Sequence, residues 1–255
     1  MATALVTGGT SGIGAAFARA LARRGDDLVL VARNVDRLEQ SAAALRAEYG
    51  VQVEVIAADL AVHDEVTRVA ERFADPARPI DLLVNNAGFG LHTKLLDPRV
   101  EIHETALDVM CKAVLVLGGA AGRAMRDRGS GRIINVSSAS GWIMQGNYSA
   151  IKAWVRVYSE SLSNELHDTG VTVTALCPGW VRTEFHQRAG IRTSSLPSWV
   201  WVDVDRLVEV ALRDAERGKA LSIPTKRWKF AVFLAAKGPH SALRAVSRML
   251  TRSRD

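Results

Sequence analysis

The chain has 255 residues, of which 48% are hydrophobic and 24% charged, and its formal net charge is +6. This length suits one large α/β domain and is short for two, and the composition is ordinary for a soluble globular protein. No uninterrupted apolar run reaches the roughly 18 residues that span a bilayer, and the N-terminus lacks the basic segment of a signal peptide. The two cysteines indicate neither a disulfide framework nor a metal site. We therefore expect a cytoplasmic protein that binds no metal.

The positive charge is concentrated at the C-terminal end of the chain. Residues 226–255 hold eight Lys and Arg residues and a single acid, Asp255, which gives a surplus of +7. Since the whole chain carries +6, residues 1–225 carry −1. We expect residues 1–225 to form the main domain and residues 226–255 to form a basic C-terminal extension.

The first predicted elements have the order that a dinucleotide site requires. Residues 3–7 predict a short strand, and a glycine-rich turn and a helical stretch at 15–24 follow. Glycines allow a sharp turn and a close approach to a pyrophosphate, while the helix N-terminus supplies N–H donors. A simple tight turn is the alternative interpretation. The residues predicted to bind the cofactor in this turn are Gly8, Thr10, Ser11, Gly12, Ile13 and Gly14.

The end of the second predicted strand, residues 27–32, indicates which dinucleotide is bound. In such folds an acidic residue at this strand end binds the ribose 2′-hydroxyl, whereas an arginine accommodates a 2′-phosphate. Here Ala32 occupies the acidic position and Arg33 follows it. The sequence therefore favours NADP over NAD, with a solvated loop charge as the alternative role of Arg33.

The remaining segments alternate regularly between strand and helix. Helical stretches at 35–49, 64–74 and 98–128 separate apolar runs at 51–57, 80–84 and 132–136. A helix running to about residue 167 and a strand at 171–176 follow, and then a helix at 205–216 and a strand at 218–224. This alternation predicts a single α/β domain with a Rossmann-like, doubly wound parallel sheet.

Tyr148 and Lys152 are the candidate catalytic pair. Residues four apart lie on one face of a helix, so both side chains can point into the same space. An ammonium group stabilises the phenolate form of a nearby tyrosine and lowers its pKa, which gives a group able to move a proton to or from an alcohol oxygen. Ser138, after the strand at 132–136, can hydrogen-bond the same oxygen. The alternative is a surface helix that carries a tyrosine and a lysine one turn apart.

Taken together, these motifs resemble the short-chain dehydrogenase/reductase family over roughly residues 3–185. They stand in the family's order, from Thr7–Gly14 through Asp59, Asn85–Gly88, Ser138 and Tyr148-x-x-x-Lys152 to Pro178–Thr183. The resemblance implies that Tyr148 transfers the proton, that Lys152 lowers its pKa and holds the nicotinamide ribose, and that Ser138 polarises the substrate oxygen. It also implies cofactor contacts from Asp59, Leu60, Asn86, Ala87, Gly88, Pro178, Gly179, Val181 and Thr183, and a homodimer or homotetramer.

Two features depart from the family pattern. Aligning residues 107–111 with the helix that carries the family's active-site asparagine puts Met110 in its place, and a thioether cannot hold the water of a proton relay. Cys111, another side chain or bulk water would have to substitute. The loop between Ser138 and Tyr148 is also shorter than the resemblance leads us to expect. A dinucleotide-binding sensor or scaffold with weak catalysis is therefore the alternative to an enzyme.

The substrate side is rich in apolar and aromatic residues. Ligand sites are mostly apolar with a few polar groups, so we expect a large pocket for a hydrophobic ketone or alcohol of a lipid, fatty-acyl or steroid-like kind. Packing in the core or at a subunit interface is the alternative. The predicted substrate-binding residues are Trp142, Met144, Gln145, Trp180 and Phe185, and His186 is interpreted as solvated or as part of the pocket wall.

The basic extension predicts a helix that ends at Gly238-Pro239 and a second one in which Arg244, Arg248 and Arg252 recur every four residues beside an apolar stripe. Basic amphipathic helices with nearby aromatic residues are typical of peripheral membrane contacts. A subunit contact with a solvated basic face is the alternative. Nucleic-acid binding is not expected, because the basic face belongs to no recognisable nucleic-acid-binding module.

Overall fold

The computed structural model describes residues 2–91, 93–182 and 200–252. Within them, one parallel sheet has the strand order β3-β2-β1-β4-β5-β6-β9. Its strands are β1 (Thr3–Thr7), β2 (Asp27–Ala32), β3 (Val53–Ala57), β4 (Leu82–Asn85), β5 (Gly131–Val136), β6 (Val171–Leu176) and β9 (Leu221–Ser222). This confirms the predicted doubly wound Rossmann-like fold. The last strand is shorter than the predicted run at 218–224.

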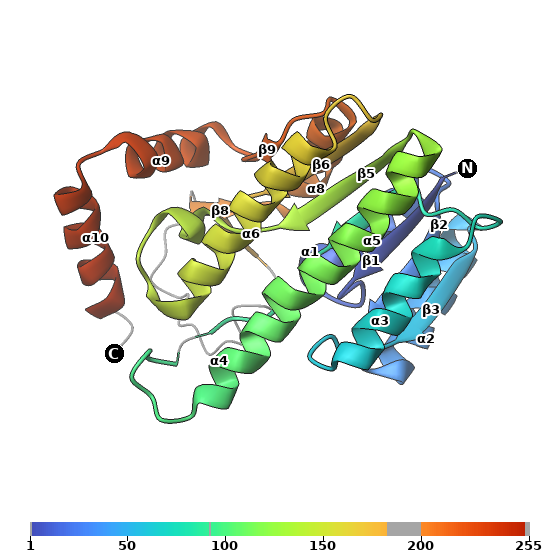
Figure 1. Cartoon of the computed structure of the whole chain (residues 1–255), viewed down its shortest axis with the longest axis horizontal. Helices are drawn as coiled ribbons and strands as arrows, with labels where there is room; N and C mark the ends of the chain where they lie inside the picture. The colour runs from blue at the N-terminus through green and yellow to red at the C-terminus, as the bar shows by residue number, and fades with distance from the viewer. Residues whose placement is uncertain (1, 92, 183–199, 253–255) are drawn as a thin grey trace.

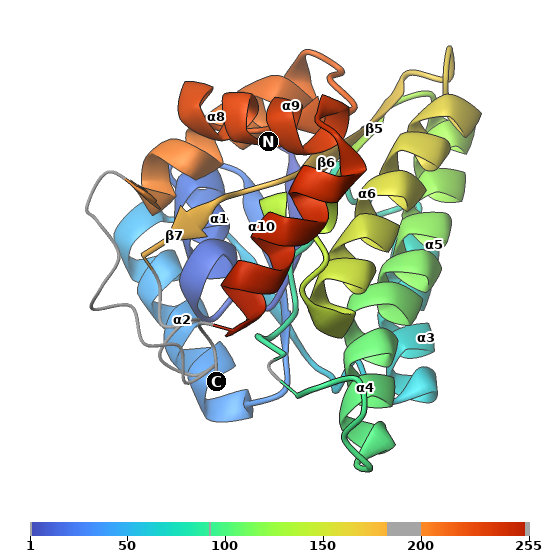
Figure 2. The same ribbon diagram turned by 90° about the vertical axis from the view of Figure 1, so that its left-hand side faces the viewer.

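Helices cover both faces of the sheet, as Figures 1 and 2 show. One layer contains α1 (Gly12–Ala22), α2 (Val35–Tyr49) and α8 (Val204–Glu216), and the other contains α3 (His63–Glu71), α5 (Ala113–Arg128) and α6 (Gly146–Glu165). Each layer buries its own apolar cluster against the sheet. Phe17 and Leu207 belong to the first cluster, and Leu117 and Met125 to the second. Side chains of successive residues in β1, such as Leu5 and Val6, point to opposite clusters, as the alternation of a strand requires.

The strand order reverses between β1 and β4. In open parallel sheets, ligands bind beyond the carboxyl ends of the strands at such a switch point. The segments that leave these two strand ends are the glycine turn after Thr7 and the Asn85–Gly88 turn. The topology therefore brings the two predicted cofactor turns together.

The predicted helix at 98–128 is interrupted by a wider turn. It consists of α4 (Val100–Leu107), a π-helical turn η2 (Asp108–Lys112) and α5. The whole stretch Val100–Arg128 has the length and apolar composition of a membrane-crossing helix. However, the inner side of α5, with Leu117 and Met125, is buried against the sheet, so these residues form a layer of the core.

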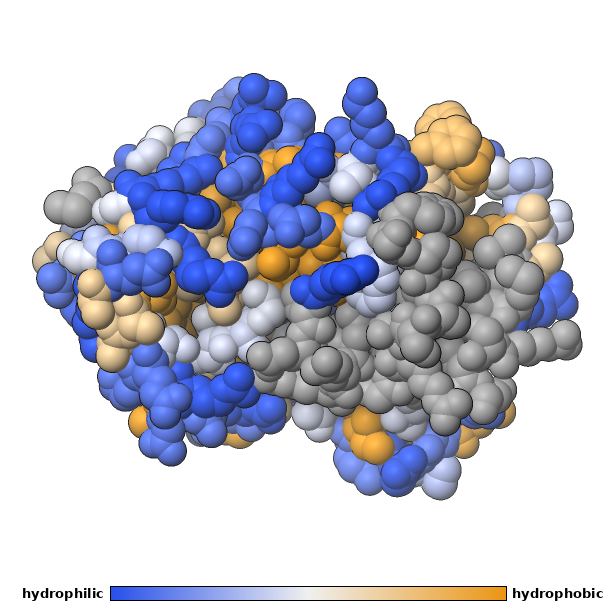
Figure 3. All heavy atoms as spheres, turned by 180° about the vertical axis from the view of Figure 1, so that it is seen from behind, coloured by the Kyte–Doolittle hydropathy of each residue, from blue (hydrophilic) through white to orange (hydrophobic). Residues whose placement is uncertain are grey.

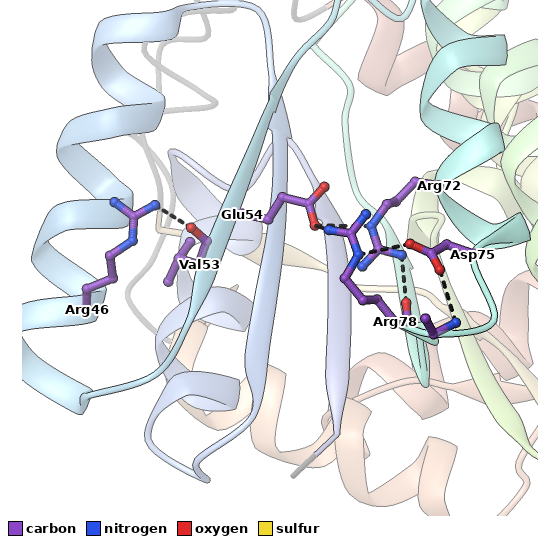
Figure 4. A network of polar contacts seen from close by, with 7 residues as sticks. Arg46, Val53, Glu54, Arg72, Asp75 and Arg78 are labelled. Carbon is purple, nitrogen blue, oxygen red and sulfur yellow. Dashed lines mark hydrogen bonds and ion pairs between the residues drawn. The ribbon is translucent and has the colours of Figure 1, made fainter.

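The outer edge of the sheet, at β3, is surrounded by charged contacts (Figure 4). Glu54 accepts hydrogen bonds from Arg72 Nε at 3.1 Å and from Arg78 Nη1 at 3.3 Å. Arg78 Nε also donates to Asp75 at 2.9 Å, and this contact lowers the pKa of the Asp75 carboxyl group. On the other side of the strand, an Arg46 guanidinium N–H donates to the Val53 carbonyl. These contacts fix β3 to α2 and to the short helix η1 (Arg72–Ala74) that follows α3.

The basic extension contains α9 (Lys226–Lys237), which follows β9, and then α10 (His240–Arg252). It is not detached from the domain. Val232 and Trp228 of α9 pack in a cluster with Ala175 and Cys177 from the end of β6. The α9 helix is therefore built onto the carboxyl end of the sheet, close to the predicted site.

Candidate active site

The glycine turn between β1 and α1 has the backbone that the sequence predicts. Gly8 and Gly12 have φ angles of +66° and +56°, in the left-handed region that glycine favours. A Cβ atom on Gly14 would lie 2.2 Å from the Gly8 carbonyl oxygen, so only glycine allows α1 to start this close to the turn. The turn and the α1 N-terminus form the kind of narrow cradle that fits a pyrophosphate.

Thr7 joins this turn to the one that follows β4. Its Oγ1 accepts hydrogen bonds from the backbone N–H groups of Asn86 and Ala87, at 2.9 and 3.0 Å. The Asn86 side-chain amide donates in turn to the Thr7 carbonyl at 3.0 Å. The turn that holds Asn86, Ala87 and Gly88 thus lies against the glycine turn, and both turns are predicted to contact the cofactor. Thr7 is the first residue of the motif in the sequence, but the motif alone assigns it no role.

The ends of β2 and β3 bring Arg33 and Asp59 together. Arg33 Nη1 lies 3.9 Å from Asp59 Oδ2, and the Arg33 side chain is 75% exposed. Asp59 Oδ1 accepts from the Ala61 N–H at 3.0 Å, and Leu60 is buried. A long contact and high exposure leave the guanidinium able to reach a phosphate beyond the strand ends.

Lys152 is buried at the end of β5, beside Tyr148. Its Nζ donates to the Val136 carbonyl at 2.9 Å and lies 5.6 Å from the centre of the Tyr148 ring. Burial lowers the pKa of the Lys152 ammonium group from 10.5 to about 8, because the charged form loses its hydration. The structure thus brings the predicted catalytic pair together on one face of α6. A hydroxyl group held near an ammonium group can pass a proton to an oxygen and receive it back.

The two serines after β5 have different environments. Ser137 Oγ donates to the Lys152 carbonyl at 2.6 Å and is buried, so it ties β5 to α6. Ser138 Oγ accepts from the Ser140 N–H at 3.1 Å and caps the short helix η3 (Ala139–Trp142). A hydroxyl oxygen that accepts a hydrogen bond from an N–H group can still donate its own O–H proton to another acceptor. Ser138 therefore retains the donor that polarising a substrate oxygen requires.

Two further polar contacts hold α6, and sequence reasoning missed both. Asn85 Nδ2 donates to Asn135 Oδ1 at 2.9 Å, and Asn135 Nδ2 donates to Ser159 Oγ at 3.0 Å, all three buried. At the start of the helix, the Asn147 amide lies 3.3 Å from His103 Nδ1, whose Nε2 lies 3.2 Å from the Lys94 carbonyl. Because a carbonyl only accepts, Nε2 carries the proton and Nδ1 accepts from Asn147. These contacts fix α6 on either side of Tyr148.

Met110 lies in the π-helical turn η2, and such turns are frequent at functional sites. The residue is buried, and a Cβ atom on Gly88 would lie 3.0 Å from its sulfur, so the thioether packs beneath the Asn85–Gly88 turn. Tyr148 packs against the apolar cluster that contains Met110 and Cys111. Burial raises the pKa of the Cys111 thiol to about 11, which leaves it a weak acid. The π-helical turn η2 therefore presents two buried sulfur-containing side chains, Met110 and Cys111, beside Tyr148.

The predicted substrate residues lie in different surroundings. Trp142 packs with the cluster of α9, and the Arg156 guanidinium carbon lies 4.8 Å from its ring centre. Met144 is exposed, and its N–H donates to Ser247 Oγ of α10 at 3.1 Å. Gln145 is buried directly before α6. Their contact with substrate stays a prediction, and Phe185 and Thr183 lie outside the described residues.

Trp180 belongs to a small parallel ribbon of β7 (Trp180–Val181) and β8 (Trp201–Val202). The Trp180 and Trp201 rings meet edge to face, 5.9 Å apart at an interplanar angle of 70°. The Arg182 guanidinium carbon lies 5.5 Å from the centre of the Trp201 ring. The strand that follows β6 is thus paired with the strand that precedes α8.

Trp228 and Arg227 at the start of α9 hold this region, and no motif predicts them. A Cβ atom on Gly179 would lie 1.9 Å from the Trp228 ring, so the indole covers the backbone at Gly179, one of the predicted cofactor contacts. Trp228 Nε1 donates to the Val200 carbonyl at 3.3 Å, and Arg227 Nη2 donates to the Trp201 carbonyl at 2.6 Å. Pro178 O accepts from the Ala139 N–H at 2.9 Å, and Val181 is buried. The segment that contains Pro178 and Gly179 is therefore held from η3 and from α9.

The sequence pattern of one family, described as short chain dehydrogenase, matches residues 2–192. The chain belongs to this family and is an NAD(P)-dependent oxidoreductase, which confirms the resemblance. Among solved structures it is similar to a short-chain dehydrogenase from Sphingobium yanoikuyae in complex with NADPH, with 37% identity, 96% of each chain covered and a TM-score of 0.84.

Two other relatives are named for ketone chemistry. A bulky-bulky ketone specific alcohol dehydrogenase from Comamonas testosteroni is 31% identical, over 94% of this chain and 96% of that one, with a TM-score of 0.79. The monensin polyketide synthase putative ketoacyl reductase of Streptomyces virginiae is 40% identical over 195 residues, which is 72% of each chain. Alcohol and ketone oxidoreduction is thus the general chemistry of its relatives.

Proposed function

We propose that the protein is an NADP(H)-dependent reductase that interconverts a hydrophobic ketone and its secondary alcohol. The observation that carries this proposal is the buried Lys152 ammonium group beside the Tyr148 ring at the end of β5. The names of the ketone-specific and ketoacyl-reducing relatives agree with it. Two buried free thiols, Cys111 and Cys177, agree with a reducing cytoplasmic compartment.

The proposed roles follow from the positions of the side chains. The glycine turn, Asp59 and the Asn86–Gly88 turn hold the dinucleotide, and Arg33 pairs with its 2′-phosphate. The bound nicotinamide supplies or takes up the hydride. In the reducing direction Tyr148 gives its proton to the carbonyl oxygen, Ser138 donates a hydrogen bond to the same oxygen, and the Lys152 charge favours the phenolate that remains. Solvent then returns the proton to Tyr148.

The fit of NADP rests on this chain's own residues as well as on its relatives. The cradle around Gly14 excludes any side chain. Ala32 occupies the position of the acid in an NAD site, and the exposed Arg33 guanidinium follows it directly. The similar structure from Sphingobium yanoikuyae contains NADPH. We therefore expect NADPH to bind at least about tenfold more tightly than NADH, since one charge-assisted contact is worth this much.

The test is to measure the affinity for NADPH and NADH and then the oxidation of NADPH with a panel of ketones from acetone to bulky aryl and steroid-like ketones. We expect tight NADPH binding and turnover that favours bulky, apolar ketones. Tight NADPH binding without NADPH oxidation in the presence of any ketone would support the sensor alternative, in which Met110 stands in place of the asparagine of the proton relay. Tighter binding of NADH would contradict the assignment of Arg33.

We also propose that the protein is a homodimer or homotetramer that assembles through the outer face of α5 and α6. Leu115 and Val157 are half exposed there, and the Tyr158 hydroxyl group donates to the Leu115 carbonyl, so the two helices are neighbours. Trp154 stacks on Tyr158 at 5.0 Å beside them. Light scattering after size-exclusion chromatography should give a dimer or tetramer for the parent and a smaller species for Leu115→Glu with Val157→Glu. A monomeric parent would contradict this proposal.

A further inference from the structure

The α9 helix carries apolar side chains on both its inner and its outer side. Its inner side is buried through Val232 and packs through Trp228. On the outer side, Phe230, Phe233 and Leu234 are 63%, 58% and 52% exposed. Residues three and four apart lie on one face of a helix, so these three side chains form a single exposed patch. Large apolar patches on a protein surface mark interaction sites.

Basic residues surround this patch. Lys226, Arg227, Lys229 and Lys237 of α9 are exposed, and Arg244 and Arg248 of α10 are exposed beyond it. The sequence has no acidic residue between 226 and 252. On a helical wheel, Lys226 and Lys237 fall on the same outward face as the two phenylalanines, at opposite ends of the helix. We call Phe230, Phe233 and Leu234, together with Lys226, Lys229 and Lys237, the α9 face.

We propose that the α9 face docks onto the surface of an anionic lipid bilayer. Phenylalanine and leucine on one side of a helix, with lysines beside them, are what an interfacial helix needs, because the apolar groups enter the acyl boundary while the ammonium groups reach the phosphates. A second copy of the chain is a poorer partner. A two-fold contact through this face would place the lysines of one copy against those of the other.

The α9 helix is already ordered without a membrane. Thr225 caps its N-terminus by accepting from the Trp228 N–H, and the Trp228 ring is held on Gly179. The α10 helix is held by a separate contact, because the buried Ser247 Oγ accepts from the Met144 N–H. In Figures 1 and 2, α9 lies at the margin of the molecule, and the space-filling view from behind shows apolar spheres at this margin, at the upper right of Figure 3. Docking therefore requires no refolding of the helix.

The experiment is co-sedimentation of the full chain with vesicles of phosphatidylglycerol and phosphatidylcholine, compared with vesicles of phosphatidylcholine alone, at low and physiological salt. We expect binding to the anionic vesicles that weakens as salt increases. Phe230→Ser with Phe233→Ser should reduce the partition coefficient at least about tenfold. Lys226→Gln and Lys237→Gln should each reduce it about fivefold, in proportion to the charge removed.

Leu95→Ser with Leu96→Ser is the matched control, since both leucines are exposed on the segment before α4. This control should bind vesicles like the parent. NADPH affinity and the thermal midpoint of each variant show that the domain is intact, and vesicle binding is measured without ketone, so its outcome is independent of the proposed activity. The proposal is overturned if the parent does not sediment with anionic vesicles, or if the Phe230 and Phe233 variant sediments like the parent. It is also overturned if the Phe230 and Phe233 variant has a smaller oligomeric state than the parent and the parent does not bind vesicles.

Discussion

The predicted cofactor side, around the glycine turn, and the proposed substrate side, around β7, β8 and α9, are held by different kinds of contact. On the cofactor side, glycines and short polar side chains join neighbouring turns. The Thr7 hydroxyl group, for example, accepts from the backbone N–H groups of Asn86 and Ala87. On the substrate side, Trp228 and Arg227 reach across from α9 to the carbonyls of Val200 and Trp201. The contacts on the cofactor side require particular residue types at fixed spacing in the sequence. The contacts from α9 require only a long side chain on an element that packs nearby in the fold.

This difference has a functional counterpart. A dinucleotide is the same in every enzyme that uses it, so its cradle can be fixed by backbone geometry. A substrate pocket must be able to change, and functional diversity is concentrated in segments placed on a rigid scaffold. We therefore expect substitutions on the two sides to act on different measured quantities. Tyr148 and Lys152 lie between the two sides.

The largest effect should come from Tyr148→Phe. Removing the proton donor should lower kcat about a thousandfold, while NADPH affinity stays within about twofold, because one hydrogen bond at most is lost on the cofactor side. Steady-state rates and NADPH fluorescence titration measure the two quantities. Tyr158→Phe, on the same helix, is the control and should keep its rate, since its hydroxyl group donates to Leu115 on the outer side. Equal losses in both variants would remove Tyr148 from the chemistry.

Arg33→Asp should act on the cofactor side alone. Replacing the guanidinium group with a carboxylate should weaken NADPH binding about a hundredfold through repulsion of the 2′-phosphate, and should leave NADH binding equal or tighter. The ketone KM at saturating cofactor should not change. Arg217→Asp, at the exposed end of α8, controls for the change in net charge. An unchanged preference for NADPH would refute the assigned role of Arg33.

Lys152→Met tests how the buried ammonium group changes the stability of the protein with pH. Burial lowers the Lys152 pKa from 10.5 to about 8, so between these values the unfolded chain holds more protons than the folded one. The free energy of unfolding therefore rises with pH in this window. The parent should gain about 2 kcal/mol relative to Lys152→Met between about pH 7 and pH 10, measured by urea unfolding.

Lys112→Met is the control for this pH dependence, because Lys112 is exposed and pairs with Asp108 at 3.3 Å. The Lys152→Met curve of stability against pH is compared with the Lys112→Met curve over the same pH range. A difference between Lys152→Met and the parent that does not change with pH would mean that the Lys152 ammonium group is hydrated in the folded protein.

The smallest predicted effect belongs to the substrate side. Trp228→Phe keeps an aromatic ring on Gly179 and removes the N–H that donates to Val200. One lost hydrogen bond should raise the KM for a bulky ketone about fivefold, with kcat and NADPH affinity unchanged. Trp154→Phe, on α6, is the aromatic control and should keep the parent KM. If NADPH affinity falls while the ketone KM rises, the two sides are mechanically coupled through Gly179.

Most of the fold and the cofactor side were predictable from the sequence, because both depend on local patterns. Glycines at fixed spacing define the turn, and apolar runs of strand length alternate with helical stretches. The π-helical turn around Met110 was not predictable, since one extra residue in a helical turn leaves the apolar periodicity almost unchanged. Nor was the contact of Trp228 with Gly179, which joins residues 49 positions apart and depends on tertiary packing alone.

The contacts around β3 also have a consequence for how copies of this protein meet in solution. An open sheet usually ends in a row of unpaired backbone groups that can template the addition of a strand from another molecule. Here Arg46 occupies the Val53 carbonyl, and Glu54 holds two arginines beside the same strand. The opposite edge, β9, is only two residues long. Aggregation by sheet extension is therefore disfavoured at both ends, and association is left to the helical faces.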